Sequence, residues 1–249
     1  MRLLDGSPGL GPLSNVDRPG RPGTRLSVLC REIERCRACP RLVEWRERVA
    51  REKRRAFRDW TYWGRPVPGF GDERAWLVIL GLAPAAHGAN RTGRMFTGDR
   101  SGDFLYAGLH RARLASQPSS VRRGDGLALD GVYVTAPCRC APPGNRPAVD
   151  ELARCAPFLD REIALLPRAR VFLALGAIAW GAVWAHLERT GAPPPRPRPK
   201  FGHGALAELP GGRALVGSYH VSQQNTQTGR LTPAMFDDVL GLAKARAGY

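Results

Sequence analysis

The sequence predicts an α/β fold in which a short, mostly parallel sheet is covered by helices on both faces. Apolar runs, each of the length of a buried strand, recur at residues 75–80, 131–136, 169–176 and 213–218. Segments with apolar residues at helical spacing lie between these runs. Strands that alternate with helices are typical of parallel sheets joined by right-handed crossovers. The run at 169–176 is very apolar, which favours a central strand.

Helices are expected before, between and after these strands. A short helix begins near Thr24, and a helix over about 101–114 has Asp99 or Ser101 as its cap. The last helix opens at Thr232, whose hydroxyl caps it and which is followed by a proline in the first turn. Two further helices are predicted at about 149–166 and 177–189.

The amino-terminal residues differ in composition from the rest. Residues 1–23 are rich in glycine, proline and isolated charges and lack a periodic apolar pattern, which predicts a flexible tail. Residues 24–249 are enough to bury a sizeable core, and we expect them to form a single domain.

The chain is strongly basic, with 38 Lys and Arg against 22 Asp and Glu and a net charge of +16. This balance favours a polyanionic partner, first nucleic acid and second an anionic membrane surface. The charged segment 41–58 has one weak apolar face and fits a solvated helix as well as a DNA-contacting one. We find no apolar run of about 18 residues and no secretory leader, so we expect a cytoplasmic protein, nucleoid-associated if bacterial.

Six cysteines are present, and Cys36 and Cys39 form a CxxC pair. Thiols stay reduced in the cytosol, so clustered cysteines there more often hold metal than form disulfides. Four cysteines can close a tetrahedral zinc site or hold a [4Fe-4S] cluster, and the residues alone leave both open.

Loops rich in glycine and polar residues follow three of the predicted strands. The first, Gly81 to Gly98, has neither the GxGxxG spacing of a dinucleotide fold nor the GK[ST] of a P-loop. Three polar side chains, His87, Asn145 and His220, lie in such loops. Because the carboxyl ends of parallel strands meet at one edge of a sheet, we expect a site there.

These loops carry motifs of a known family. The segments are Gly81-Leu-Ala-Pro-Ala-Ala-His-Gly88, Met95-Phe-Thr-Gly98, Cys140-Ala-Pro-Pro-Gly-Asn145 and Ser218-Tyr-His-Val-Ser222. In this order and spacing they resemble the uracil-DNA glycosylase superfamily, and more specifically its type-b, or family 5, iron-sulfur enzymes. The resemblance covers roughly residues 36–240 and implies a three-layer α/β/α sandwich around a short, mostly parallel sheet.

The resemblance also implies a [4Fe-4S] cofactor. Its ligands would be Cys36, Cys39, Cys140 and Cys155, one thiolate for each iron. Cys30 and Cys138 would be spare thiols, although Cys138 is close enough in sequence to exchange roles with Cys140.

Substrate-binding roles follow from the same resemblance. Phe96 would be the ring on which a flipped base stacks, and the backbone of Gly81, Leu82 and Ala83 would line the base pocket. His220 would donate a hydrogen bond to the negative charge that develops on the departing base.

The chain departs from other branches of the family at the water-positioning group. Those branches have an acidic or amide side chain in the first motif, where this chain has Leu82 and Ala83. By resemblance, Asp72 would orient the water or stabilise the cationic sugar, and Asn145 would position the water or the base. His87 either lines the pocket or is incidental.

The segment after His220 is polar and rich in amides. Such a flexible loop is expected to enter the minor groove and fill the gap left by the flipped base, with Arg230 on a phosphate. Its expected DNA-contacting residues are Ser222, Gln223, Gln224, Asn225 and Arg230. A polar turn before the last helix fits the same composition.

The implied activity is base-excision repair of DNA: the enzyme would flip out uracil and hydrolyse its N-glycosidic bond, leaving an abasic site. The apolar first motif favours a broad base range that includes hypoxanthine. No lysine in the motifs suits a Schiff-base nucleophile, so we expect a monofunctional enzyme. The expected partner is double-stranded DNA, with single-stranded DNA as a second substrate, and the expected state is a monomer without membrane contact.

Two other functions fit parts of the sequence. A non-catalytic nucleic-acid-binding protein, stabilised by zinc or a cluster, would explain the charge and the cysteines. A phosphate-ester hydrolase would need several metal-binding carboxylates near the strand ends, and only Asp72 and Asp99 are near.

Overall fold

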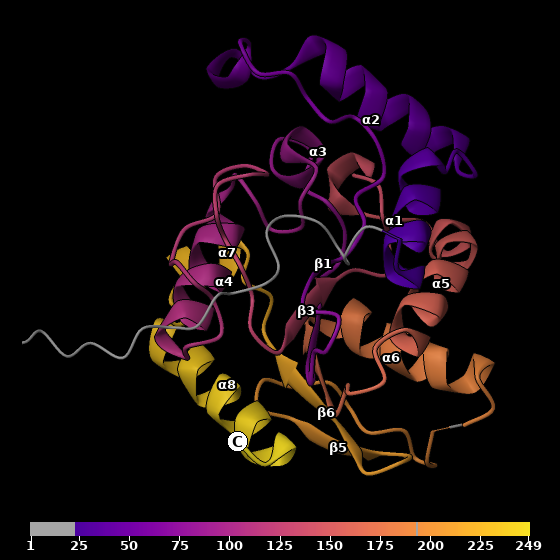
Figure 1. Ribbon diagram of the computed structural model, residues 1–249, viewed down its shortest axis with the longest axis vertical. Coiled ribbons are helices and arrows are strands. Elements are labelled where there is room, and N and C mark those ends of the chain that lie inside the picture. The colour runs from indigo at the N-terminus through magenta and orange to yellow at the C-terminus, as the bar shows by residue number, and fades with distance from the viewer. Residues whose placement is uncertain (1–22, 193) are drawn as a thin grey trace, which may run out of the picture.

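The computed structural model describes residues 23–192 and 194–249 of the chain. The flexible tail predicted for residues 1–23 therefore lies outside the described residues, apart from Gly23. In the described part, a twisted sheet runs through the centre of the molecule and helices lie on both of its sides (Figure 1).

The sheet has six strands in the order β1-β3-β2-β4-β6-β5. Their bounds are β1 Phe70–Gly71, β2 Leu77–Leu80, β3 Val132–Thr135, β4 Val171–Leu175, β5 Leu206–Leu209 and β6 Arg213–Ser218. The four middle strands are parallel, whereas β1 and β5 run antiparallel to their neighbours at the two edges. All four predicted strands are confirmed, and β4 lies inside the sheet as expected.

Eight α-helices are present among the described residues. They are α1 Arg25–Arg35, α2 Pro40–Glu52, α3 Ala89–Thr92, α4 Arg100–Arg111, α5 Val149–Ala164, α6 Ala177–Arg189, α7 Gln223–Gln227 and α8 Pro233–Ala247, with two 3-10 turns, η1 Arg55–Phe57 and η2 Pro143–Asn145. In this part of the chain, no helix combines the length and apolar character needed to cross a membrane.

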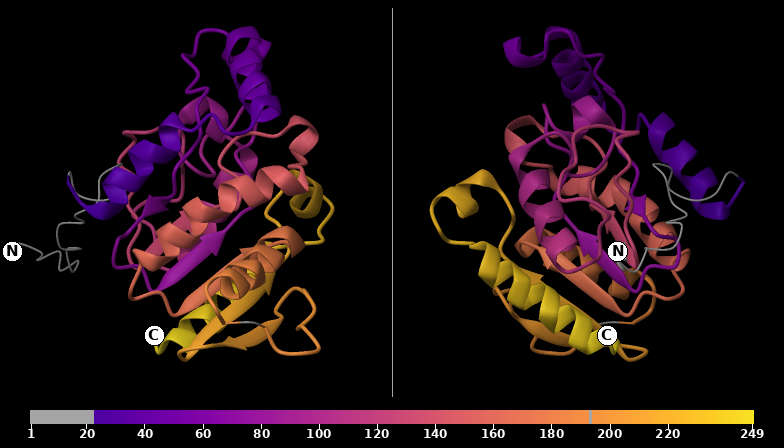
Figure 2. Two further views of the ribbon diagram at one scale, coloured as in Figure 1. Left: turned by 90° about the vertical axis from the view of Figure 1, so that its right-hand side faces the viewer. Right: turned by 60° about the vertical axis from the view of Figure 1, so that its left-hand side comes forward.

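Two helical layers enclose the sheet because successive strand residues point to opposite faces. Leu77 and Ile79 of β2 pack in one core with residues of α4 and α8, whereas Val78 and Leu80 pack in a second core with residues of α1, α5 and α6. Figure 2 shows α8 and α4 on one side of the sheet and α5 and α6 on the other. The predicted α/β/α sandwich is therefore confirmed.

Side-chain caps fix where two of the predicted helices begin. The Oδ1 atom of Asp99 accepts hydrogen bonds from the backbone N–H groups of Ser101 and Gly102, so Asp99 caps α4. The hydroxyl of Thr232 accepts from the N–H of Met235 at 3.2 Å and caps α8. Both capping predictions are confirmed, with Asp99 as the cap of α4 rather than Ser101.

The charged segment 41–58 is not one helix, which corrects that expectation. Helix α2 ends at Glu52, and Lys53 has a positive φ of 55°, a conformation that a helix cannot continue through. The chain then forms η1 and an irregular stretch before β1. This segment projects beyond α3 at the top of Figure 1.

Candidate active site and cysteine cavity

A cavity of 440 Å³ lies at the edge of the sheet where the parallel strands β2, β3 and β6 end. Its apolar lining consists of Leu82, Ala83, Ala85, Ala89, Met95, Phe96 and Ala136. Its polar side chains are Asp99, Ser101, Asn145, Arg146, His220, Ser222 and Gln224. Ligands of open α/β sheets bind at this edge, and the volume suits a small molecule or a single base.

The aromatic ring of Phe96 packs against Gly81, and it fits there because Gly81 has no side chain. A Cβ atom at Gly81 would lie 2.5 Å from Cζ of Phe96, so only glycine permits this contact. Phe96 itself has a positive φ of 50°, which indicates local strain. Its ring centroid is 6.2 Å from that of His220. Gly81 thus supports the Phe96 ring from behind rather than lining the cavity, whereas Leu82 and Ala83 line it directly.

His220 follows β6 and reaches the cavity as a neutral side chain. Burial lowers its pKa to about 4, so the imidazole carries no charge at neutral pH and keeps one N–H to donate. The side-chain amide of Asn225 donates to the carbonyl oxygen of His220 at 2.8 Å. This contact fixes the backbone of the loop that carries His220.

Asp99 is a cavity residue that the sequence analysis identified as a helix cap and as a carboxylate near the strand ends, but not as a catalytic residue. Its Oδ1 atom accepts from Ser101 N at 3.0 Å and Gly102 N at 3.1 Å. Its Oδ2 atom lies over Gly88, where an added Cβ would be 1.8 Å away. Burial raises the pKa of the Asp99 carboxyl, and the two backbone N–H groups partly offset this. The sequence signal was a carboxylate directly after the Met95-to-Gly98 motif.

Asp72 does not reach the cavity, which argues against the catalytic role predicted for it. Its Oδ2 atom accepts from the N–H of Gly131 at 3.1 Å, and Oδ1 accepts from Arg74 N at 2.9 Å. Gly131 directly precedes β3, so Asp72 lies at the amino ends of the parallel strands. The cavity lies at the opposite, carboxyl ends.

Asn145 and His87 have different placements. Asn145 lines the cavity from η2, where it has a positive φ of 57° and an exposed side chain. His87 lies outside the cavity lining, and its Nδ1 atom is 3.0 Å from the hydroxyl of Tyr62.

The residues after His220 also differ in whether they line the cavity. Ser222 and Gln224 line the cavity, whereas Gln223 is exposed and Asn225 bonds within the loop. Arg230 is exposed, with its guanidinium carbon 4.6 Å from the centroid of the Tyr219 ring.

Five of the six cysteines line a second, smaller cavity next to the first residues of α2. They are Cys36, Cys39, Cys138, Cys140 and Cys155. The four predicted ligands thus come together from the CxxC turn, the loop after β3 and helix α5. Cys30 lies apart, buried among apolar residues between α1 and the sheet.

Cys138 differs from its neighbour Cys140 in its contacts. The Cys138 thiol donates a hydrogen bond to the carbonyl oxygen of Cys140 at 3.3 Å. Arg139, between them, is fully buried and pairs with Glu162 at 2.6 and 3.1 Å, which anchors the loop. Cys140 instead meets the guanidinium of Arg46.

The surroundings of Arg46 suit a negatively charged, thiolate-bound group. Its guanidinium is 2% exposed and donates to Cys140 Sγ at 2.8 Å and to the Cys36 carbonyl oxygen at 3.1 Å. Its Nε atom is buried without a hydrogen-bond partner in the part of the chain that the structure describes. The nearest carboxylate, on Glu47, is 3.9 Å away and already pairs with Arg37. Burial raises the pKa of the Cys140 thiol to about 12, so Cys140 would compensate the buried cation only as a metal-bound thiolate.

The spacing of these cysteines bears on the kind of metal group. Within residues 23–192 and 194–249, no three His, Cys, Asp or Glu side chains are close enough to share one metal ion. A zinc site gathers its four ligands around one ion, whereas a cubane cluster takes one thiolate at each of four irons. The described residues thus form a cavity lined by five cysteines without closing such a single-ion site.

The family comparison agrees with the sheet and the cavity at its edge. Residues 68–244, which include all six strands and every residue that lines the cavity, match the model of the uracil DNA glycosylase superfamily, and the chain belongs to that superfamily.

Within the superfamily, the chain is similar to proteins named type-5 uracil-DNA glycosylase. It is 58% identical to the protein from Mycobacterium tuberculosis over 217 residues, which are 87% of this chain and 80% of the relative. It is 58% identical to that from Thermus thermophilus over 214 residues, 86% of this chain and 94% of the relative. A type-4 enzyme from Pyrobaculum aerophilum is 36% identical over 114 residues, 45% of this chain and 50% of the relative.

Proposed function

We propose that this protein is a uracil-DNA glycosylase that flips uracil out of DNA and hydrolyses its N-glycosidic bond. The observation that carries the proposal is one cavity that combines an aromatic ring, a neutral imidazole and a half-buried carboxylate, in a chain of this superfamily. Flipping a base out of the duplex costs a few kcal/mol of stacking and pairing free energy, and contacts in such a pocket offset this cost. The flipped base stacks on Phe96.

Asp99 acts on the water. In the reaction, the bond between C1′ and the water oxygen forms as the bond between C1′ and the base nitrogen breaks. The electron pair of the broken bond leaves with the base, and the carboxylate of Asp99 takes the proton of the water. The same negative charge stabilises the cationic sugar in the transition state. Asp99 replaces Asp72 in this role because only Asp99 lines the cavity.

His220 acts on the base. As the base departs, negative charge develops on its carbonyl oxygen, and the N–H of the neutral imidazole donates a hydrogen bond to that oxygen. His220 keeps its proton throughout. Asn145 and Gln224, from the loops on either side, supply amide groups that position the base or the water.

The apolar lining favours a broad base range. Ala83, Ala85, Ala89 and Ala136 present only methyl groups to the cavity, which leaves space for a purine and gives little polar readout of the base edge. Hypoxanthine is therefore proposed as a second substrate. The chain contains only Lys53, Lys200 and Lys244, and none of them lines the cavity in the described residues, which supports a monofunctional enzyme.

The proposed cofactor is a [4Fe-4S] cluster held by Cys36, Cys39, Cys140 and Cys155. When bound, it would join the CxxC turn, the loop after β3 and helix α5 through metal–sulfur bonds. Arg46 would offset the negative charge of the thiolates. Cys138 keeps its proton and stays outside the ligand set.

We expect base release from a labelled duplex that contains one uracil opposite guanine, with strand cleavage only after alkali treatment. Release of hypoxanthine from a matched duplex is expected at a measurable rate, because the alkyl-lined cavity admits a purine. Strand cleavage without alkali would contradict the monofunctional mechanism, and strict uracil dependence would contradict the broad base range. A protein that binds the duplex and releases no base would instead be the non-catalytic binding protein.

Replacing His220 with alanine is expected to lower the single-turnover rate of uracil release by about 10²–10³-fold, the usual effect of removing one donor to a developing oxyanion. Duplex affinity should change little, because the hydrogen bond strengthens only as charge develops. Gel-shift titration and rapid-quench kinetics measure the two quantities. His87→Ala is the matched control, since His87 lies outside the cavity lining and should leave the rate within a few fold.

A further inference from the structure

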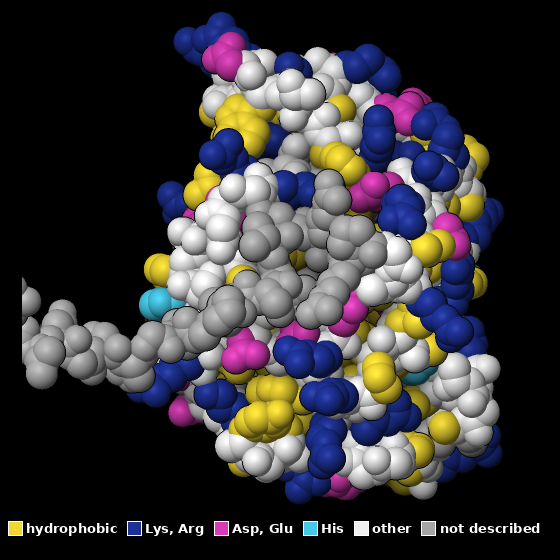
Figure 3. Space-filling view, in the orientation of Figure 1, with side chains coloured by type: hydrophobic (Ala, Val, Ile, Leu, Met, Phe, Trp, Pro, Cys, Tyr) yellow, Lys and Arg dark blue, Asp and Glu magenta, His cyan; other side chains and the backbone are white. Residues whose placement is uncertain are grey.

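Residues 51–65, named the basic arm here, carry six Lys and Arg side chains and two carboxylates. Arg54, Arg55 and Arg58 are exposed, and none of them forms an ion pair within the described residues. In Figure 3, dark-blue side chains lie at the top of the molecule, where Figure 1 shows this segment projecting, as well as along the right-hand side and the lower part of this face. The arm therefore presents a concentrated positive charge to solvent.

Arg91 ties the basic arm to the rim of the active-site cavity. Its guanidinium carbon lies 3.9 Å from the centroid of the Phe57 ring and 4.1 Å from that of the Trp60 ring, so these two rings of the arm stack on it. The same guanidinium donates to the carbonyl oxygens of His87 at 2.8 Å and Gly98 at 2.6 Å. Gly98 directly precedes Asp99. One buried side chain thus joins the arm to the loop that carries the catalytic carboxylate.

Further contacts place the arm beside the loop after β2. The Tyr62 hydroxyl meets Nδ1 of His87 at 3.0 Å, and the N–H of Trp63 donates to the carbonyl oxygen of Arg91 at 2.9 Å. The pKa of His87 is lowered first by burial and then by the charges of Arg54 and Arg91, so Arg54 is close enough to affect this loop. Residues 57–64 of the arm are therefore held against the loop after β2, which leads to Asp99.

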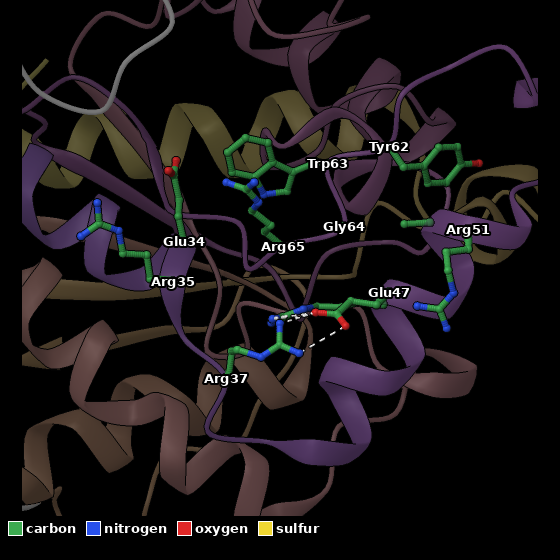
Figure 4. Close-up of a pocket in the computed structure, with 11 residues that line it drawn as sticks. Glu34, Arg35, Arg37, Glu47, Arg51, Tyr62, Trp63, Gly64 and Arg65 are labelled. Atoms are coloured by element: carbon green, nitrogen blue, oxygen red, sulfur yellow. Dashed lines mark hydrogen bonds and ion pairs between the residues drawn. The ribbon is translucent and has the colours of Figure 1, made fainter.

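A groove of 490 Å³ between α1, α2 and the arm extends the positive surface (Figure 4). Its two carboxylates are already paired, Glu47 with Arg37 and Glu34 with Arg123. Arg35, Arg51 and Arg65 also line it. The groove therefore offers cationic side chains whose charge is not cancelled by the acids it contains.

We propose that the basic arm binds phosphates of the DNA strand that flanks the flipped base, and so acts as a second, sequence-independent DNA contact beside the cavity. The inference rests on the proposed glycosylase function. Arginine suits phosphate because its planar guanidinium donates two parallel hydrogen bonds. An arm fixed by Arg91 loses little conformational freedom when it binds, unlike a loose charged loop. Its position at the rim brings the flanking backbone over Arg54, Arg55 and Arg58.

The test is the salt dependence of duplex binding by a variant with Arg54→Gln, Arg55→Gln and Arg58→Gln. We expect the slope of log K against log salt to become shallower by about 0.9 for each arginine that neutralises a phosphate, hence by about 1–3 in total. The single-turnover rate of uracil release at saturating duplex should match that of wild type, since these side chains do not touch the base.

The matched control carries Arg25→Gln, Arg168→Gln and Arg170→Gln, which removes the same charge at the opposite, amino-terminal edge of the parallel strands. Its slope should stay close to that of wild type. Equal slopes in the arm variant and the control, with both proteins folded by circular dichroism, would overturn the inference. Wild type that releases no uracil would instead refute the proposed function, whatever the slopes.

Discussion

Asp99→Asn is expected to lower the single-turnover rate of uracil release by about 10²–10⁴-fold, the range for loss of a general base. Asparagine is as good a helix cap as aspartate, and its amide oxygen can still accept from Ser101 N and Gly102 N. The fold and the start of α4 should therefore persist. Rapid-quench kinetics with uracil-containing duplex measures the rate, and thermal unfolding checks the fold.

The pH dependence separates a chemical role of Asp99 from a structural one. Only the carboxylate can accept a proton, so the rate of wild type should rise as pH increases through the pKa of Asp99. Burial raises that pKa, so this acid limb should lie above that of an ordinary aspartate. His220 is already neutral above about pH 4, so its titration should not change the rate near neutral pH. The Asp99→Asn variant should lose the acid limb.

Asp72→Asn is the matched control for the same change of side chain. Asparagine cannot accept hydrogen bonds at both positions, so the variant loses either the Gly131 or the Arg74 contact and should be less stable by about 1–3 kcal/mol. Its rate of base release should stay within a few fold of wild type. A rate that collapses in Asp72→Asn and persists in Asp99→Asn would reverse the two assignments.

The two aspartates show why the site was only partly predictable from the sequence. Each directly follows a glycine, and spacing alone does not reveal at which edge of the sheet each one lies. Asp72 follows β1, and β1 runs antiparallel to β3, so its carboxyl end meets the amino ends of the parallel strands. Asp99 follows the parallel strand β2 in the chain and lies at the carboxyl ends of the parallel strands, where the cavity is. The direction of the strand that precedes each aspartate therefore decides whether its side chain can reach the cavity.

The parallel strands were predictable because each is a continuous apolar run buried on both faces. The edge strands were not. β1 has only two residues, too few to show any periodicity. β5 has four residues that alternate between exposed and buried positions, which is too short a pattern to identify a strand. Pairing with a neighbour, not local pattern, makes these segments strands.

Phe96, Asn145 and His220 lie where the motifs predicted, in loops that follow parallel strands. The support for Phe96 was not visible in the sequence, because the requirement for glycine at position 81 comes from a ring that is 15 positions further along the chain. The basic arm was likewise hidden, since the charged segment looked like a continuous helix. Its link to the cavity depends on Arg91, a tertiary contact without a local signal.

The cysteine cavity gives the second large expected effect. Cys140→Ser should abolish the visible absorbance and the iron content of the purified protein, because serine is a poor replacement for a thiolate ligand. With the cluster bound, the change would also remove the thiolate that compensates buried Arg46, and a broken buried pair costs about 3–5 kcal/mol. For a chain of this size, each kcal/mol corresponds to about 2–4 °C in Tm, so Tm should fall by roughly 6–20 °C.

Cys138→Ser is the matched control, two positions away and also buried. Serine can donate to the carbonyl oxygen of Cys140 as the thiol does, so iron content and absorbance should be retained and Tm should fall far less. Elemental analysis, visible spectra and thermal unfolding of the two variants measure these differences without any assay of base release. Loss of iron in Cys138→Ser and its retention in Cys140→Ser would exchange the two ligand assignments. One zinc ion per chain in wild type would exclude the cluster, and the buried thiolate beside Arg46 would then belong to a zinc site.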